Sequence, residues 1–139
     1  MINIISGKKG RGKTKILLEQ ANTCIANANG SVIFLDKDNS LMYELDRQIR
    51  LINIQEFDKF NLDGFIGLIY GILSQDHDIT DIFIDGLYAL SNIDLSSLDD
   101  ATKKLDEISK KFKVNFTISL SEETENISDF TKQFVKISL

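Results

Sequence analysis

The 139-residue chain contains no proline and no tryptophan, and it has one cysteine and one histidine. The single cysteine, Cys24, cannot form an internal disulfide, and the lack of a cysteine–histidine cluster excludes a structural zinc site. The longest apolar run, Phe65 to Leu73, is too short to span a bilayer. No signal peptide precedes Lys8, so we expect a reduced, cytoplasmic protein.

Basic residues are fewer than acidic ones over the whole chain, but several of them lie close together in its first fifteen positions. The chain has 16 basic and 21 acidic residues and a formal net charge of −5. Five basic residues lie in the first fifteen positions, with no acid among them, whereas residues 16–139 carry a net charge of −10. An acidic chain is a poor general partner for nucleic acid, whose affinity comes mainly from lysine and arginine on phosphates. The local basic cluster favours one small anionic ligand.

The apolar pattern alternates between strands and helices. Hydrophobic residues make up 42% of the chain and charged residues 27%, as in ordinary globular proteins. The pattern predicts strands at residues 2–5, 31–35, 50–54, 81–86, 114–120 and 133–138, and helices at residues 13–28, 41–48, 57–74, 95–112 and 122–132. Such alternation predicts βαβ units. We therefore expect an α/β fold: a three-layer domain over residues 1–139, with about five or six mainly parallel strands.

A glycine-rich segment, GKKGRGKT from Gly7 to Thr14, matches the pattern G-x-x-x-x-G-K-[ST] and lies between the first strand and the first helix. Glycines let successive backbone N–H groups turn inward around an anion, and the following helix adds the positive end of its dipole. Lys13 is expected to reach the β- and γ-phosphates, and the Thr14 hydroxyl to ligate Mg²⁺. The predicted nucleotide-binding residues are Gly7, Lys8, Lys9, Gly10, Arg11, Gly12, Lys13, Thr14 and Lys15.

Acidic residues follow two of the predicted strands. The strand Ile82 to Asp85 ends in a carboxylate that is the second candidate ligand of Mg²⁺, through water, because this ion keeps much of its hydration shell. Asp36 and Asp38 follow another strand and are candidates to activate the attacking water. A helix cap or a turn is the alternative role for both.

These motifs resemble those of P-loop NTPases over most of the chain. In the ParA/MinD-like branch a signature lysine follows the first glycine of the loop, so the resemblance makes Lys8 a candidate catalytic residue, and Asp36-Lys37-Asp38 is similar to the Asp-x-Asp of that branch. In the RecA-like branch a helix and a strand ending in a polar sensor residue follow the acidic strand, which is the layout of residues 85–121. The chain departs from the first branch at Lys9, where glycine is usual, and it is shorter than most members of that branch. It departs from the second branch because Asp36 and Asp38 stand near the end of the second strand, where that branch has a catalytic glutamate, and because Gly86 rather than a glutamate follows Asp85.

The resemblance implies a cytoplasmic ATP-binding protein that needs Mg²⁺, a slow ATPase acting as a nucleotide-controlled switch or assembly factor. A homodimer or another protein partner is compatible with such a switch, and we expect neither nucleic acid nor a membrane as partner. ATP is preferred to GTP because the chain has no N-K-x-D or T-K-x-D motif. Two alternatives stay open. One is a small-molecule or nucleotide kinase, which the scarcity of arginine disfavours. The other is a non-hydrolysing nucleotide-binding interaction module.

Overall fold

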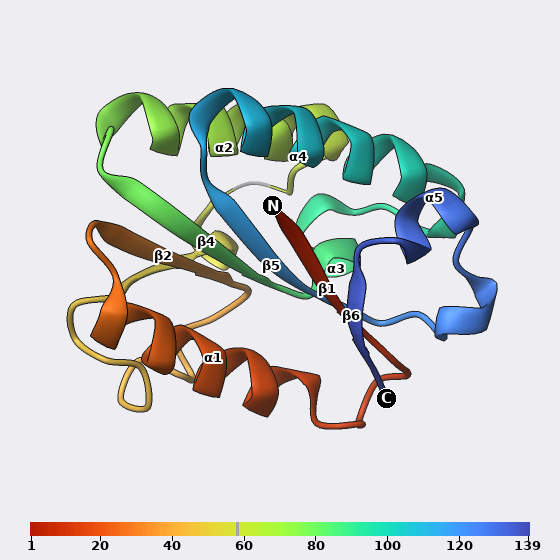
Figure 1. The fold of residues 1–139 in the computed structure, drawn as a ribbon, viewed down its shortest axis with the longest axis horizontal. Coiled ribbons are helices and arrows are strands. Elements are labelled where there is room, and N and C mark those ends of the chain that lie inside the picture. Colours follow the sequence, from red (N-terminus) through yellow and green to blue (C-terminus); the bar gives the residue numbers. More distant parts are fainter. Residues whose placement is uncertain (58) are drawn as a thin grey trace.

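The computed structural model describes residues 1–57 and 59–139, and its strands form one parallel sheet (Figure 1). In those residues every neighbouring pair of strands is parallel. The spatial order is β3-β2-β4-β5-β1-β6. The strands are β1 (Ile2–Ser6), β2 (Ser31–Asp36), β3 (Arg50–Asn53), β4 (Ile79–Asp85), β5 (Asn115–Leu120) and β6 (Val135–Ser138). The predicted α/β fold, with about five or six mainly parallel strands, is confirmed.

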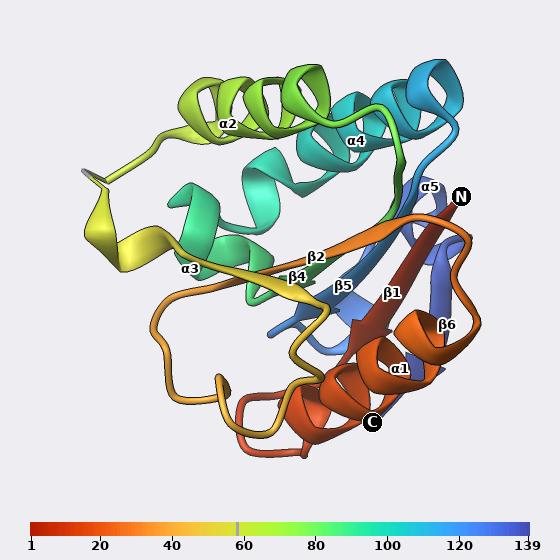
Figure 2. The ribbon, with the colours of Figure 1, turned by 90° about the vertical axis from the view of Figure 1, so that its left-hand side faces the viewer.

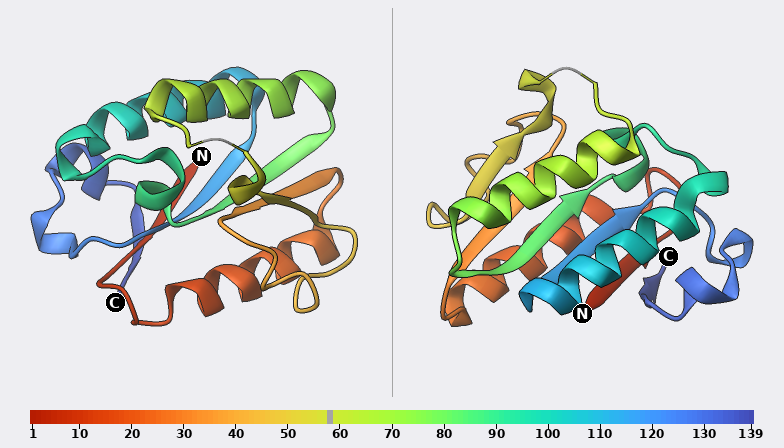
Figure 3. Two further views of the ribbon diagram at one scale, coloured as in Figure 1. Left: turned by 180° about the vertical axis from the view of Figure 1, so that it is seen from behind. Right: turned by 90° about the horizontal axis from the view of Figure 1, so that it is seen from above.

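Helices cover both faces of the sheet and give the three layers (Figures 1 and 3). Helix α1 (Lys13–Asn27) lies on one face, and α2 (Leu62–Gln75) and α4 (Leu98–Phe112) lie side by side on the other. Two short helices, α3 (Leu87–Ser91) and α5 (Asp129–Lys132), and three 3-10 turns, η1 (Ile54–Glu56), η2 (Leu95–Ser97) and η3 (Thr124–Asn126), complete the elements. Within the described ranges, no helix combines the length and apolar character needed to cross a bilayer.

The sheet separates two hydrophobic clusters. The larger cluster fills the space beneath α2 and α4, where Phe65 and Leu105 meet Phe116 of β5. The smaller cluster lies beneath α1 and contains the parallel rings of Phe34 and Phe83, with centroids 6.1 Å apart. Strands β2, β4 and β5 are buried on both faces, which explains their nearly continuous apolar sequences.

Helix α2 begins later than the apolar pattern predicts. The prediction placed its start at residue 57, but the helix starts at Leu62 because the Asn61 side chain accepts a hydrogen bond from the Gly64 N–H at 2.8 Å. Residue 58 lies outside the described residues. The apolar side chain of Phe60, which extended the predicted helix, instead packs against the larger core from the segment before the cap.

The predicted helix at residues 41–48 is wrong: this segment is a series of turns. The Asn22 side chain on α1 donates to the Glu44 carbonyl at 2.9 Å and accepts from the Asp46 N–H at 2.8 Å, which holds the segment against α1. The apolar side chains that suggested a helix do pack in the smaller core, but from a loop: Leu41, Leu45 and Ile49.

The predicted helix at residues 122–132 is also wrong, since the segment contains only η3 and the single-turn α5. Ser128 has an extended backbone and starts α5, because its side chain accepts a hydrogen bond from the Thr131 N–H. Both Ser128 and Thr131 donate to the Asp99 carboxylate at 2.6 Å. These contacts to α4 favour a short capped turn over a continuous helix.

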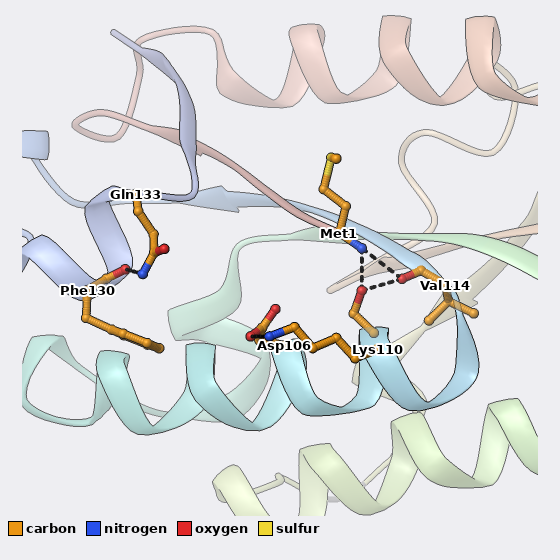
Figure 4. Close-up of polar contacts among 7 residues, drawn as sticks. Met1, Asp106, Lys110, Val114, Phe130 and Gln133 are labelled. Carbon is orange, nitrogen blue, oxygen red and sulfur yellow. Dashed lines mark hydrogen bonds and ion pairs between the residues drawn. The ribbon is translucent and has the colours of Figure 1, made fainter.

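The amino-terminal end of β1 is attached to the end of α4 (Figure 4). The Met1 ammonium donates to the Ser109 hydroxyl and to the Val114 carbonyl, and the same hydroxyl donates to that carbonyl at 2.6 Å. Lys110 and Asp106 form an ion pair at 3.0 Å on the same helix. These contacts fix the start of β1, and the strand then carries the chain to the glycine-rich loop at the opposite edge of the sheet.

Candidate nucleotide-binding site

The glycine-rich loop joins the carboxyl end of β1 to the start of α1. Gly10 and Gly12 have φ angles of 89° and 88°, in the left-handed region that favours glycine. A Cβ at either position would meet no atom within 4 Å, so the backbone conformation, rather than a lack of space, requires glycine there. Gly12 also precedes a helix whose first turn contains no acidic side chain, which leaves the positive end of the helix dipole uncompensated.

The Lys13 side chain is folded back over this loop. It is 7% exposed, and its Nζ donates to the Gly7 and Lys8 carbonyls, each at 2.8 Å. Burial lowers the pKa of Lys13, and the negative charge of Asp85 opposes that change. The loop thus surrounds the Lys13 ammonium group. This cation can exchange its two carbonyl partners for the oxygens of a bound anion.

Thr14 and Asp85 meet across the same loop, although 71 positions separate them. The Thr14 hydroxyl donates to both carboxylate oxygens of Asp85, at 3.1 and 3.2 Å. The neighbouring strand β5 fixes the carboxylate, because the Ser119 hydroxyl donates to Asp85 Oδ1 at 2.7 Å and accepts from the Gly86 N–H at 2.7 Å. Ser119 is the register partner of Asp85, so the strand pairing itself sets this contact.

A cavity of about 460 Å³ opens over these groups. This volume lies in the range of about 300–1,000 Å³ that is typical of small-ligand sites. Figure 2 shows the loop before α1 and helix α3 at the edge of the sheet where the cavity lies. The lining residues come from the loop, from the ends of three strands and from α3: Lys9, Gly10, Gly12, Lys13, Thr14, Lys37, Asp85, Gly86, Tyr88, Ala89, Ser119 and Ser121.

No protein-family model and no curated protein matches this chain. The interpretation of the site therefore depends on its residues and their geometry. Those residues give a buried lysine within a glycine loop, a hydroxyl beside a carboxylate, and a cavity above them. Backbone N–H groups with a lysine are suited to bind phosphate oxygens, and a hydroxyl beside a carboxylate offers the oxygen ligands that a divalent cation prefers.

The Thr14–Asp85 pair fits the requirements of Mg²⁺. Both side chains offer oxygen, which this ion prefers, and Mg²⁺ usually takes only one or two protein ligands, the others being water and phosphate oxygens. In the part of the chain that the structure describes, no group of three or more histidine, cysteine, aspartate or glutamate side chains could hold a metal without such help. A cation at this place would therefore depend on a bound phosphate.

Asp36 lies at the carboxyl end of β2, next to the strand that carries Asp85. Its side chain is 3% exposed and accepts a hydrogen bond from the Lys37 N–H at 2.7 Å. Burial raises the pKa of Asp36 to about 6, and the nearby charge of Asp85 adds to this effect. A carboxylate with such a pKa is a competent general base near neutral pH, yet Asp36 is not among the described residues that line the nucleotide cavity.

Asp38 is placed differently. Its carboxylate accepts a hydrogen bond from the Ser40 N–H at 3.0 Å, and the hydrogen bonds from Ser40 lower its pKa. Asp38 lines a second cavity beside the first one. It has the geometry of a turn-forming aspartate, which was the alternative role expected for it. Activation of water by either aspartate stays a prediction.

Lys8, the candidate signature lysine, points to a carboxylate of its own chain. Its Nζ lies 3.0 Å from Glu123 Oε1, just after β5, and its side chain is 63% exposed. This contact lowers the pKa of Glu123. Lys9, in contrast, lines the cavity, as a second loop cation beside Lys13.

The sequence motifs did not assign a role to every lining residue, and Lys37 and Tyr88 are two examples. Lys37 reaches the cavity from the end of β2, and its place between two candidate aspartates was the available signal. Tyr88 belongs to α3, a helix too short to produce a periodic pattern. The Tyr88 hydroxyl donates to Glu122 Oε1 at 2.8 Å, and its pKa is raised by burial and by that carboxylate. Tyr88 thereby joins α3 to the segment after β5 along the cavity wall.

Proposed function

We propose that this chain is a cytoplasmic ATP-binding P-loop protein that requires Mg²⁺, hydrolyses ATP slowly, and acts as a nucleotide-controlled switch or assembly factor. One observation carries the proposal. Lys13 is held at the centre of a loop whose glycines have a left-handed backbone conformation, and Thr14 beside it contacts Asp85 at the end of β4. These are the groups that the resemblance to P-loop NTPases assigns to phosphate and Mg²⁺.

Each side chain has a defined role in this proposal. Lys13 exchanges the two loop carbonyls for oxygens of the β- and γ-phosphates, and the backbone N–H groups around Gly10 and Gly12 complete the anion site. Thr14 and Asp85 hold Mg²⁺, which when bound neutralises phosphate charge. Ser119 keeps the Asp85 carboxylate in place through a 2.7 Å hydrogen bond.

Slow hydrolysis is proposed because a water-activating carboxylate is not in place. Asp36 is buried beside the site, and Asp38 bonds to its own turn. A conformational change that brings Asp36 to the cavity would couple nucleotide state to the shape of the segment after β2. Of the two branches, the RecA-like one is favoured by the succession of β4, α4 and β5, with Ser119 beside Asp85.

Thermal unfolding with Mg-ATP, Mg-ADP or Mg-GTP tests nucleotide binding. At about 100 times its Kd, a ligand adds about 2.7 kcal/mol to the free energy of unfolding, which raises the Tm of a domain of this size by several degrees. We expect this rise with ATP for the wild type and for the control Lys103→Ala, whose side chain is exposed on α4, outside the glycine-rich loop and the cavity lining, and none for Lys13→Ala. An equal rise in Lys13→Ala, or no rise with any nucleotide, contradicts the proposal.

Turnover is then measured as phosphate release by the wild type and Asp36→Asn. We expect slow release that Mg²⁺ chelation abolishes and that the substitution reduces at least tenfold. Unchanged release in Asp36→Asn rules out Asp36 as the water-activating group but leaves nucleotide binding intact.

A further inference from the structure

A second cavity adjoins the proposed nucleotide site at the edge of the sheet. It has a volume of about 480 Å³ and lies between the end of β2, η1, the segment before α2, and α3. Lys37 and Ala89 line both cavities, so the two are direct neighbours. The shared wall lies beside Asp85, at the side of the proposed site where the cation would be held.

The walls of this second cavity are apolar and aromatic. Ile54 and Leu90 are buried at its base, and Phe57 and Phe60 form one side with ring centroids 6.1 Å apart and planes inclined at 44°. Phe57 is 48% exposed, which is high for a phenylalanine next to a hydrophobic core. Two adjacent rings that line a cavity suit a planar aromatic group, because contacts between aromatic rings stabilise beyond simple burial.

The polar groups on the rim favour an anion. Lys37 and Lys59 line the cavity, and Asp38 is the carboxylate on the same lining. Hydrogen bonds from Ser40 already engage the Asp38 carboxylate. The rim therefore has a surplus of positive charge in a chain whose net charge is −5. Gln55 adds an amide that can donate to, or accept from, a polar substituent.

Hydrogen bonding keeps this wall attached to α3. The Asn92 side chain, at the end of α3, donates to the Phe60 carbonyl at 2.6 Å. Helix α3 starts at Leu87, and its N-cap Gly86 follows Asp85 directly, so one five-residue helix joins the aromatic wall to the proposed cation site. A movement of α3 or of the Lys37 side chain would therefore change the shape of both cavities.

From these observations we infer that the second cavity binds an aromatic organic anion next to the phosphate end of the nucleotide site. The rings of Phe57 and Phe60 pack against the planar group of the ligand. Lys37 and Lys59 attract its negative charge, and Lys37 also couples this ligand to the nucleotide because it lines both cavities. The existence of the pocket is independent of the proposed function, whereas the coupling rests on it. In the proposed nucleotide-controlled switch, this aromatic anion would be a second ligand whose binding depends on the nucleotide.

The experiment uses 8-anilinonaphthalene-1-sulfonate (ANS), an aromatic anion that fluoresces in apolar sites, with the full chain and no nucleotide. We expect saturable binding of one ANS per chain, and at least fivefold weaker binding of its uncharged analogue N-phenyl-1-naphthylamine. Phe57→Ala should weaken ANS binding at least fivefold and Lys59→Gln about threefold. The control variants are Phe130→Ala, at a ring that is 40% exposed on α5, and Lys136→Gln on β6, and they should bind as the wild type does.

Each other outcome overturns a stated part of the inference. Equal affinity for the two dyes overturns the preference for an anion. Binding that Phe57→Ala leaves unchanged, or that Phe130→Ala weakens equally, overturns the placement of the site. Tm values within 2 °C of the wild type show that the variants are folded, since partly unfolded chains also bind ANS.

Coupling is tested by repeating the titration with saturating Mg-ATP. We expect the ANS affinity to change at least threefold in the wild type and to stay constant in Lys13→Ala. If ATP raises the Tm but leaves ANS binding unchanged, the coupling is overturned. If ATP has no effect on Tm while ANS binding still requires Phe57, the proposed function fails and the aromatic-anion pocket stands.

Discussion

Replacing Asp36 by asparagine should stabilise the protein, and the gain should depend on pH. Burial raises the pKa of Asp36 from its ordinary 3.8 to about 6. A raised carboxyl pKa means that the folded state binds the proton more tightly than the unfolded state, so wild-type stability falls as the pH rises from about 4 to about 6. At 1.36 kcal/mol for each tenfold change in affinity, the ionised carboxylate costs about 3 kcal/mol above pH 7. Asparagine keeps the acceptor for the Lys37 N–H without the charge.

Urea unfolding at pH 4, 5, 6 and 8 measures this effect. The stability difference between Asp36→Asn and the wild type should be about 3 kcal/mol at pH 8, about half of that at pH 5, and close to zero at pH 4. A variant that is no more stable than the wild type at pH 8, or a difference that does not change with pH, would refute the reasoning. The gain in stability should accompany the loss of phosphate release predicted above, since a buried catalytic charge is costly to the fold.

Asp38→Asn is the matched control, two positions away. Hydrogen bonds from Ser40 lower the pKa of Asp38, so its charge contributes stability that is present at neutral pH and lost as the pH falls below the ordinary carboxyl pKa. The substitution should therefore reduce stability at pH 8, which is the opposite sign to Asp36→Asn. The same sign for both variants would show that removal of acidic charge alone explains the result.

Two further substitutions test the framework of the site by urea unfolding. Ser119→Ala should cost about 1–3 kcal/mol, because it removes the hydroxyl that donates to the half-buried Asp85 and that accepts from the Gly86 N–H, which then loses this acceptor; a loss below 0.5 kcal/mol contradicts the geometry. Gly30→Ala should cost about 1–3 kcal/mol, because its Cβ would lie 2.0 Å from the Asp78 carbonyl oxygen. Gly67→Ala, in open space on α2, should instead stabilise by about 0.5–1 kcal/mol, and similar effects at both glycines would contradict the contact.

The strands and the glycine-rich loop were predictable because their signals are local. Continuous apolar runs such as residues 32–35 of β2 occur where a strand is covered on both faces, and the left-handed backbone of the loop requires glycine at Gly10 and Gly12. The contact between Thr14 and Asp85 was also predictable, since both lie where parallel strands end at one edge of the sheet.

What could not be predicted depends on contacts between distant segments. The turns at residues 41–48 replace a helix because Asn22 supplies hydrogen bonds from another element, and no local pattern encodes that partner. Likewise, the burial of Asp36 and the ion pair of Lys8 with Glu123 arise from tertiary packing. The second cavity combines η1 with the short α3, which periodicity does not reveal.

The position of β1 in the sheet has a consequence for how the protein forms during synthesis. This strand leads into the glycine-rich loop, yet its two neighbours are β5 and β6, which are made more than 100 residues later. A ribosome that has produced only the first half of the chain has translated every residue of the loop without the strands that hold it. Long-range parallel pairing is slow. The glycine-rich loop is therefore expected to reach its final conformation late in folding, after β5 and β6 have been made.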